Sequence, residues 1–559
     1  MLQPPFKDQL LRFQAEPVLF AERVNQIKLR QQPLPELTQK SIKANIWRNH
    51  TFESIGNLSQ MFARTYGTEL NLNYSEYDSS LSFSNYSTAD IEIVWLNPEE
   101  YDNSLSPKSW ANWFKDRVSL LRQNTKSPVL IITWSDGPVV YTELQQAVRS
   151  IPDIHPVDLS EYATSKNLQL INPRTKELSG TPVDSAVLHS LSRTLFCKWI
   201  SSCCMRPIKA IALDLDNTLH HGVLAEDGIE GIEITDAHVE LQKAVLSYKE
   251  RGVFLALLSR NEEDDVRQLL RENTAYILKE SDFSAFCVSW QSKSEALREI
   301  SEKLRIGQDS ILFVDDNIGE LSETANAEPA VQLIAAHQDA SVTKRAIEFH
   351  PGVWQWTVTH EDKIRAADLA ANEIRQSLQS TSDNKSDYFR NIGAKLSIYR
   401  NPKQLLERLA NMSIKTNQFN LALRRLTKTD IDNAIISEDQ DVIAVGMKDN
   451  LSDSGIIAFL VISKTDELLT VEELCISCRA LGRGLENTII SEAIKFSTLM
   501  GSNQKLRFKY VIGPRNAPAL KWLENFTECQ LSDATLEVTL PASVLYNLPL
   551  EEGIVIEKQ

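Results

Sequence analysis

The stretch IKAIALDLDNTLHHG, residues 208–222, runs from apolar residues directly into two aspartates, Asp214 and Asp216. Its first half has the composition of a buried strand. Aspartate, however, is a poor strand former, and carboxylates this close together repel each other. A chain that ends a buried strand in this way needs something there to stabilise the two charges, and a bound cation is the first candidate.

Length and composition indicate a multidomain protein of ordinary soluble character. The chain has 559 residues, of which 42% are hydrophobic and 24% charged, and this length predicts about three or four domains. The net charge of -16 argues against nucleic acid and against anionic membranes as partners. The sequence has no apolar run of transmembrane length and no signal-peptide pattern, and it has seven cysteines, so we expect a cytoplasmic protein.

Apolar periodicity divides the chain into units. Residues 1–40 are predicted to be helical. Strands and helices alternate over 41–200 and again over 201–345, which predicts parallel sheets with helices on both faces. Residues 346–394 are expected to form a helical linker. The remaining segment, 395–559, has more antiparallel character and predicts a smaller α+β domain.

The central unit places further polar residues at predicted strand ends. LLSRN ends one strand with Ser259, ILFVDDN ends another with Asp315 and Asp316, and KSEALREI opens a helix with Lys293. Ligands of parallel sheets bind at the carboxyl ends of the strands, so we expect these side chains to meet Asp214 there. Carboxylates suit Mg²⁺, whereas a hydroxyl and an ammonium group suit phosphoryl oxygens.

The order of these motifs resembles the haloacid dehalogenase (HAD) superfamily, which has DxDxT followed by serine, lysine and DD. The resemblance implies a Rossmann-like core in which Asp214 is the nucleophile that forms an aspartyl-phosphate and Asp216 is the acid/base. An ordinary strand-to-turn junction would explain DLDNT alone but not the other motifs. The resemblance further implies that phosphate is bound by Thr218, Ser259 and Lys293, and Mg²⁺ by Asp214, Asp216, Asp315 and Asp316.

The short spacings between these motifs leave no room for a large cap domain. The stretch HHGVLAEDGIEGI after DLDNT predicts a small hairpin flap. An uncapped site is open to a large substrate, such as a group on a carrier protein. His220 and His221 are placed where they could contact substrate, and two exposed flap histidines are an equal alternative.

Longer stretches resemble the FkbH-like family, in which a HAD phosphatase-like domain precedes an acyltransferase-like (GNAT) domain. These stretches are DLDNTLHHGVLAEDGIEGIEI, LLSRNEEDDV, KSEALREISEKLRIGQDSILFVDDN, KTNQFNLALRRL and SCRALGRGLE. The resemblance also implies an N-terminal flavodoxin-like domain related to SGNH hydrolases. That domain has RNHT after its first predicted strand and no catalytic serine motif, so we interpret it as an inactive binding or docking domain.

The stretch SCRALGRGLE predicts a strand followed by a helix that opens on glycines. Under the GNAT resemblance, Arg479, Gly482, Arg483 and Gly484 bind the pyrophosphate of coenzyme A or the phosphopantetheine arm of a carrier protein, with Asn516 in support. A tight strand-to-helix turn without any ligand is the alternative.

Three more residues are candidates in this C-terminal unit. Cys478 lies beside the predicted cradle, where an arginine and a helix N-terminus favour a reactive thiolate, and a buried strand cysteine is the alternative. Asn417 and Arg424 belong to TNQFNLALRR and are candidates for binding an acidic substrate group, or else they brace the domain.

Characterised relatives of this kind are similar to glyceryl transferase/phosphatases. The resemblance therefore implies 1,3-bisphosphoglycerate as substrate and an acyl carrier protein as partner, in polyketide or other secondary metabolism. This chain departs from relatives with a cysteine between the two aspartates, because it has Leu215 there. The alternative is a Mg²⁺-dependent phosphatase fused to a coenzyme A-dependent acyltransferase that acts on a small phosphorylated or sugar intermediate. A non-enzymatic scaffold would not need the complete acidic motif set.

Overall fold

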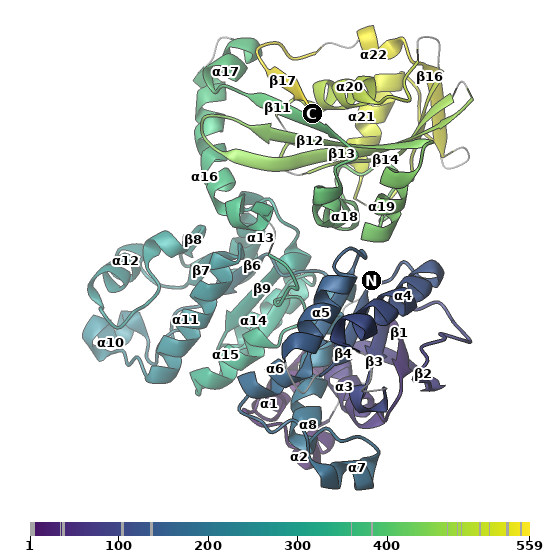
Figure 1. Ribbon diagram of the computed structural model, residues 1–559. Helices are drawn as coiled ribbons and strands as arrows, with labels where there is room; N and C mark the ends of the chain where they lie inside the picture. The colour runs from purple at the N-terminus through teal and green to yellow at the C-terminus, as the bar shows by residue number, and fades with distance from the viewer. Residues whose placement is uncertain are drawn as a thin grey trace. The chain divides into compact units, whose positions relative to one another are not determined.

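Figure 1 shows the structure, which is a computed structural model of the chain. It describes residues 6–33, 35, 40–101, 106–134, 138–358, 360–381, 384–466, 468–477, 479–481, 483–501, 505–513, 515–532, 536–547 and 550–559. Internal contacts divide the chain into two compact units, Met1–Val358 and Thr359–Gln559. Among the helices in the described ranges, none combines the length and the apolar character needed to cross a membrane.

The first sheet of unit 1 is entirely parallel, with the strand order β2-β1-β3-β4-β5. Neighbouring residues of β3 face different apolar layers: Ile93 belongs to the core cluster that contains α3 and α8, and Val94 to the one that contains α4 and α5. This arrangement confirms the predicted parallel α/β architecture. The strands are β1 (Lys40–Arg48), β2 (Thr68–Tyr77), β3 (Ile91–Trp95), β4 (Val129–Thr133) and β5 (Ile154–Asp158). The helices are α3 (Glu53–Thr65), α4 (Pro107–Asn124), α5 (Pro138–Val148), α6 (Leu159–Ser165), α7 (Pro173–Ser179) and α8 (Ser185–Thr194).

The second sheet of unit 1 is also parallel and has the order β10-β9-β6-β7-β8. Its central strand is β6, which is the buried strand that the opening stretch predicts. The strands are β6 (Ala210–Leu213), β7 (Phe254–Ser259), β8 (Ala285–Val288), β9 (Ile311–Asp315) and β10 (Gln332–Ala335). The helices are α10 (Leu224–Gly231), α11 (Asp236–Glu250), α12 (Glu263–Glu272), α13 (Lys293–Lys303), α14 (Ile318–Ala327) and α15 (Ala340–Glu348).

One apolar core joins the two sheets of unit 1. The same cluster of buried side chains contains Ile93 of the first sheet and Leu213 of the second. A helical connection of π-helix Leu195–Ile200 and α9 (Ser201–Cys204) links the sheets, and Lys198 in it pairs with Glu348 of α15 at 2.6 Å. The shared core explains why both sheets fall in a single unit.

The segments predicted as N-terminal helices and as a linker also pack into the units. Of α1 (Phe6–Leu19) and α2 (Gln26–Arg30), α1 contacts the second sheet at its β10 edge, where Arg12 donates to the Leu333 carbonyl. The segment 346–394 is divided between the units. Val353 lies in the core of unit 1, whereas α16 (His360–Thr381) packs on β13 of unit 2.

Unit 2 is built on a mixed sheet with the order β16-β15-β14-β13-β12-β11-β17. Strands β11 to β14 pair antiparallel, as the sequence predicts, whereas β14 pairs with β15 in parallel. The strands are β11 (Lys395–Arg400), β12 (Gln440–Lys448), β13 (Asp453–Thr465), β14 (Leu468–Ile476), β15 (Lys505–Lys509), β16 (Glu537–Pro541) and β17 (Val555–Lys558). The helices after α16 are α17 (Lys385–Asn391), α18 (Leu406–Lys415), α19 (Lys428–Ile436), α20 (Glu486–Phe496), α21 (Ala517–Thr527) and α22 (Val544–Asn547).

Candidate active site

Polar side chains gather at the carboxyl edge of the second sheet, where its three middle strands end. Asp214 follows β6 directly, and its amide donates to the Val314 carbonyl of β9 at 2.9 Å. Ser259 is the last residue of β7 and Asp315 the last of β9. Because β9, β6 and β7 are neighbours, the sequence motifs that carry these residues meet at one edge, as predicted.

Lys293 connects two of the carboxylates. It begins α13 after the cap residue Ser292, and its buried amine donates to Asp214 Oδ1 and to the Leu258 carbonyl at 2.8 Å. The same nitrogen lies 3.4 Å from Asp315 Oδ2. Burial opposes a charge on this amine, but the two carboxylates raise the pKa of Lys293, so it stays protonated.

The three acidic residues at this edge repel one another. Burial raises the pKa of Asp214 to about 7 against the opposing effect of Lys293, and Asp315 adds to the rise. Burial and the neighbouring Asp214 raise the pKa of Asp316 to about 6. One lysine therefore does not neutralise the cluster.

This cluster has the donor set of a hard cation. One oxygen from each of Asp214, Asp315 and Asp316 lies within 4.8 Å of the others. Asp315 Oδ2 is buried and accepts no hydrogen bond from the described residues. Carboxylate oxygens with room for water and phosphate are what Mg²⁺ takes in proteins, so these residues fit that ion. Asp216, which we predicted as a fourth ligand, is not in the cluster.

Asp216 is held by its own set of partners. Its oxygens accept from Asn261 Nδ2 at 2.8 Å and from the Leu224 amide at 3.0 Å, and His220 Nε2 lies 3.3 Å away. Burial raises the pKa of Asp216, but these hydrogen bonds lower it further, so the net shift is downward. Asn261 also donates to Ser259 Oγ at 2.8 Å, which ties the serine to the aspartate.

Asn261 is a site residue that the sequence analysis missed. The signal was present, because Asn261 follows the strand end in LLSRN by two residues. Its other amide atom, Oδ1, is buried and has no hydrogen-bond partner in the described ranges, and the same holds for Thr218 Oγ1. Both atoms are available to a ligand at this edge.

The interpretation of His220 as an exposed flap residue is wrong. Its side chain is 0% exposed, and its ring lies between Asp216 and the Tyr276 hydroxyl, to which it is hydrogen bonded. Burial behind Asp216 also contradicts direct substrate binding by His220. The residue positions the carboxylate instead.

The predicted hairpin flap is helical. His221 and Glu233 pair through an antiparallel bridge, as in a hairpin, but the residues between them form α10 with a kink at Gly228. Leu224 at its start donates its amide to Asp216, so the flap is fixed to the site. Between Asp216 and Ser259 the chain forms α10, α11 and β7 and no inserted domain.

The residues predicted to bind coenzyme A or pantetheine are only partly described. Cys478 and Gly482 lie outside the described residues. Arg479 and Gly484 lie between β14 and α20, and Gly484 has a φ of +71°, which favours glycine. The prediction for Arg483 is wrong, since its side chain is buried against Asn372 and Ser454 at 3.2 and 3.3 Å and does not face a ligand.

Asn516, Asn417 and Arg424 make protein contacts in unit 2. Asn516 is fully buried and uses its amide on the Asn420 and Val511 carbonyls, both at 2.9 Å, which contradicts a ligand role. Asn417 accepts from Arg425 at 2.7 Å. Arg424 is exposed and pairs with Glu472 at 3.1 Å, and its position agrees with the bracing alternative.

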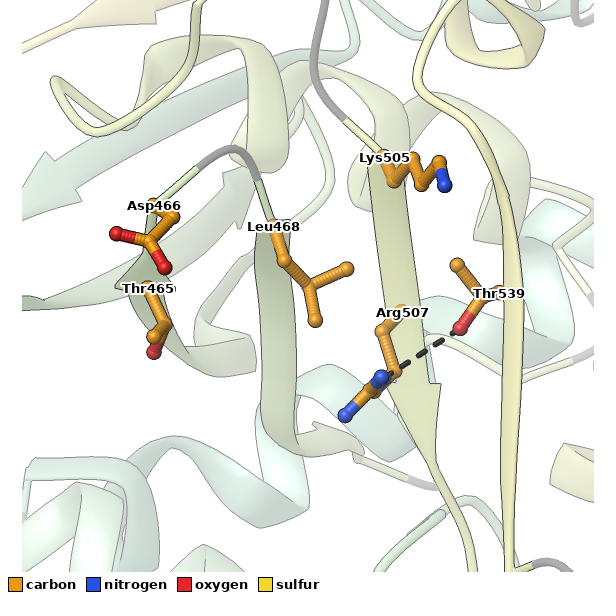
Figure 2. Close-up of a pocket in the computed structure, with 6 residues that line it drawn as sticks. All are labelled: Thr465, Asp466, Leu468, Lys505, Arg507 and Thr539. Carbon is orange, nitrogen blue, oxygen red and sulfur yellow. Dashed lines mark hydrogen bonds between the residues drawn. The ribbon is translucent and has the colours of Figure 1, made fainter.

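A pocket of about 410 Å³ lies elsewhere in unit 2, and Figure 2 shows it. In it, Arg507 donates to Thr539 Oγ1 at 3.4 Å. None of our predicted site residues lines this pocket, so it is not the site that the sequence predicts. The lining residues are Thr465, Asp466, Leu468, Lys505, Arg507 and Thr539.

The carboxyl edge of the first sheet holds no serine nucleophile at the end of β1. There, Asn49 Oδ1 accepts from the Asn97 amide at 2.7 Å, and His50 is buried against Trp95. These contacts agree with the interpretation of an inactive domain.

Comparisons with known proteins give distant likenesses. No protein-family model and no curated protein matches the chain. Among solved structures, the chain is similar to the N-terminal part of the protein BF1531 from Bacteroides fragilis, which contains a phosphatase domain complexed with Mg, with a TM-score of 0.43 and 18% identity over 60% of this chain and 99% of that one. It is also similar to nourseothricin acetyltransferase, with a TM-score of 0.15 and 20% identity over 19% of this chain and 66% of that one. A third likeness is to a fungal multi-domain GH3 beta-N-acetylglucosaminidase with a GCN5-related glucosamine N-acetyltransferase region, with a TM-score of 0.19 and 11% identity over 94% of this chain and 67% of that one.

Proposed function

We propose that the chain is a cytoplasmic, Mg²⁺-dependent phosphohydrolase joined to an acyltransferase-like domain. The observation that carries the phosphohydrolase half is the site at the end of β6. There Asp214 is buried, is hydrogen bonded to Lys293 and lies in one cluster with Asp315 and Asp316. A carboxylate held this way can act as a nucleophile toward phosphorus. An ordinary strand-to-turn junction would not require such a cluster of buried charges.

The reaction proceeds in two displacements at phosphorus. A carboxylate oxygen of Asp214 forms a bond to phosphorus as the bond to the leaving oxygen breaks, and the minor fraction of Asp216 that holds a proton gives it to that oxygen. In the second step Asp216 takes a proton from water, whose oxygen displaces Asp214 and releases inorganic phosphate. The hydrogen bonds from Asn261 and Leu224 favour the carboxylate form that this second step needs.

The remaining residues stabilise the negative charge of the phosphoryl group during its transfer. Asp214, Asp315 and Asp316 would hold Mg²⁺, and the ion would neutralise negative charge on the phosphoryl oxygens and on these carboxylates. Lys293 keeps its positive charge beside Asp214 and stabilises the transferred group. The hydroxyls of Thr218 and Ser259 donate to its other oxygens, and Thr218 Oγ1 is free of partners among the described residues.

The test is phosphate release by the purified protein with Mg²⁺. We expect Asp214→Asn to abolish turnover of acyl phosphates and phosphate esters while the melting temperature stays near that of the wild type. Asp236→Asn, on the exposed start of α11, is the matched control and keeps full activity. Full activity in Asp214→Asn refutes the aspartyl-phosphate mechanism.

At a finer level we propose an FkbH-like enzyme that dephosphorylates 1,3-bisphosphoglycerate and transfers glyceryl to an acyl carrier protein, with the SGNH-like domain as a docking module. The chain between Asp216 and Ser259 carries no inserted domain, which suits a substrate on a long carrier arm. Asp214 acts on the phosphate ester at C3, whereas the thiolate of Cys478 is the proposed acyl acceptor: it attacks the acyl carbon at C1, expels the C1 phosphate and passes the acyl group to the carrier thiol. The test is to incubate the protein with 1,3-bisphosphoglycerate and the carrier protein and to measure the intact mass of the carrier. The proposal requires that the carrier gain the mass of a glyceryl group.

A second candidate is a phosphatase fused to a coenzyme A-dependent acyltransferase that uses Arg479 and Gly484. It is favoured by Leu215, which is 0% exposed and stands where glyceryl-loading relatives have a thiol. Under this candidate the substrate is a small phosphorylated or sugar intermediate. Phosphate release without mass gain on a carrier, together with acetyl-coenzyme A consumption, would separate it from the first.

A further inference from the structure

Trp290 is an exposed tryptophan next to the phosphohydrolase site. It lies between the end of β8 at Val288 and the start of α13 at Lys293. Its side chain is 65% exposed, although a tryptophan buries more apolar surface than any other residue when it packs. Three residues of chain span at most about 10 Å, which limits the separation between the Cα atoms of Trp290 and Lys293.

A hydrogen bond links the indole ring to the segment that carries Asn261. Trp290 Nε1 donates to Glu262 Oε1 at 3.1 Å. Glu262 directly follows Asn261, whose amide is bonded to Asp216 and Ser259. The hydrogen bond restricts the indole, and a side chain that is already restricted loses less freedom when it binds a ligand.

The charged group that contacts the indole is negative. Glu262 has no cationic partner among the described residues and is followed by the acidic first turn of α12. The nearby arginines are already paired, Arg260 with Glu320 at 2.7 Å and Arg267 with Glu263 at 2.5 Å. An indole that donates to a carboxylate attracts cations to its face more strongly, and a second anionic group is repelled here.

We infer that Trp290 and Glu262 form a subsite for a positively charged nitrogen on the leaving group of the substrate. The inference rests on the proposed phosphohydrolase activity and names its substrate class: organic monophosphates whose leaving group carries an ammonium or alkylated ammonium group several atoms from phosphorus. This class agrees with the second candidate function and not with 1,3-bisphosphoglycerate, whose leaving group carries another phosphate.

The experiment compares two matched series of substrates with the full-length protein and Mg²⁺. One series consists of ω-(trimethylammonio)alkyl phosphates with two to six chain carbons. The other has a neutral tert-butyl group in place of the trimethylammonium group, so size and shape are retained. Phosphate release gives kcat/KM for each, and the series of lengths finds the separation between the phosphate and the ring.

We expect the wild type to prefer the cationic member by about 3- to 10-fold at its best chain length. Trp290→Ala brings this ratio to about 1, whereas Trp290→Phe keeps part of the preference. Glu262→Gln retains an acceptor for the indole, removes the charge and lowers the ratio. Tyr546→Ala, which removes another exposed aromatic ring, keeps the wild-type ratio.

Two results overturn the inference alone: a wild type that hydrolyses both series equally at every length, or a preference that survives both Trp290→Ala and Glu262→Gln. A wild type that releases no phosphate from any substrate overturns the proposed function, and this inference with it. Asp214→Asn must abolish turnover of both series, which separates a missing subsite from a missing reaction.

Discussion

At the scale of the residue, Lys293 sets the charge balance of the candidate site. Its amine contacts Asp214 and Asp315, both of which are buried at the ends of neighbouring strands. Burial of a charged carboxylate costs free energy unless a cation lies near it. Lysine is suited to this position because its flexible stem brings a compact charge from the start of α13 to the end of β6.

Replacement of Lys293 by methionine should impair the reaction, and it should also lower the free energy of unfolding because Asp214 and Asp315 lose their buried cation. Lys293→Met keeps the length of the stem and removes the charge, so we expect phosphate release with Mg²⁺ to fall by about 100- to 1,000-fold. Steady-state kinetics with a circular dichroism spectrum as a check for folding measures this. Lys243→Met, on the exposed face of α11, is the control, and equal activity in the two variants would exclude Lys293 from catalysis.

A second buried acid, Glu473 of β14, makes unit 2 sensitive to pH. Glu473 is 0% exposed and accepts from the Arg424 amide at 2.9 Å and from the Cys475 thiol at 3.3 Å. Burial raises the pKa of Glu473 above its ordinary value of 4.5, against the opposing hydrogen bonds. The folded state therefore holds a proton that the unfolded chain releases, and stability falls as the pH rises above about 4.5.

Glu473→Gln removes this loss of stability at high pH, and the glutamine still offers an oxygen that accepts from the Arg424 amide. We expect the variant to melt at a higher temperature than the wild type at pH 8 and to show a smaller difference at pH 5. Thermal melts of both proteins at the two pH values measure it. The exposed Glu438→Gln is the control, and a difference that is independent of pH would show that the charge of Glu473 is not the cause.

At the scale of the element, α16 is part of unit 2 rather than a free connection. Arg375 on α16 donates two hydrogen bonds to Asp449 after β12, at 2.7 and 2.9 Å, and one to Asp368 at 3.1 Å. Ser454 of β13 donates to the same Asp368 at 2.7 Å. Because these groups are buried, they hold the helix in one register against the sheet.

Arg375→Met should uncouple α16 from the sheet. The variant leaves the Asp449 carboxylate buried without its cation, whereas Asp368 keeps Arg483 at 3.7 Å. Loss of one partner of a buried pair costs about 3–5 kcal/mol. Urea denaturation followed by tryptophan fluorescence measures the free energy of unfolding. Arg390→Met breaks an exposed pair with Asp387 and should change it by less than about 1 kcal/mol. Equal effects would mean that the buried network does not hold the helix.

Elements were more predictable from the sequence than the positions of polar side chains. Strand β6 lies in the apolar half of residues 208–222, as predicted, because an apolar pattern is a property of local sequence. The acidic motifs also met as predicted, since parallel strands bring their carboxyl ends to one edge. The prediction that Arg483 binds a ligand was wrong because the position of its side chain depends on Asp368 and Asn372, more than a hundred residues earlier in the chain. Asn261 was missed because its bond to Asp216 crosses from one strand end to another.

At the scale of the whole molecule, unit 1 contains every residue of the proposed phosphohydrolase site, and its two sheets share a core. Residues of β1 and of β7 belong to one apolar cluster, so neither sheet can lose its packing alone. Unit 2 has apolar clusters of its own around β13. This division predicts that the chain unfolds in two steps and not in three.

Differential scanning calorimetry with and without Mg²⁺ tests this division and the metal site together. We expect two transitions, of which Mg²⁺ raises only the one of unit 1, by a few degrees, since an ion at about 100 times its Kd stabilises the state that binds it by about 2.7 kcal/mol. Asp315→Asn should abolish the shift because it removes a buried ligand of the cluster, whereas Asp236→Asn should keep it. Three transitions would contradict the shared core. A Mg²⁺ shift that survives Asp315→Asn would place the ion elsewhere in the chain and would leave Lys293 as the main charge that opposes Asp214.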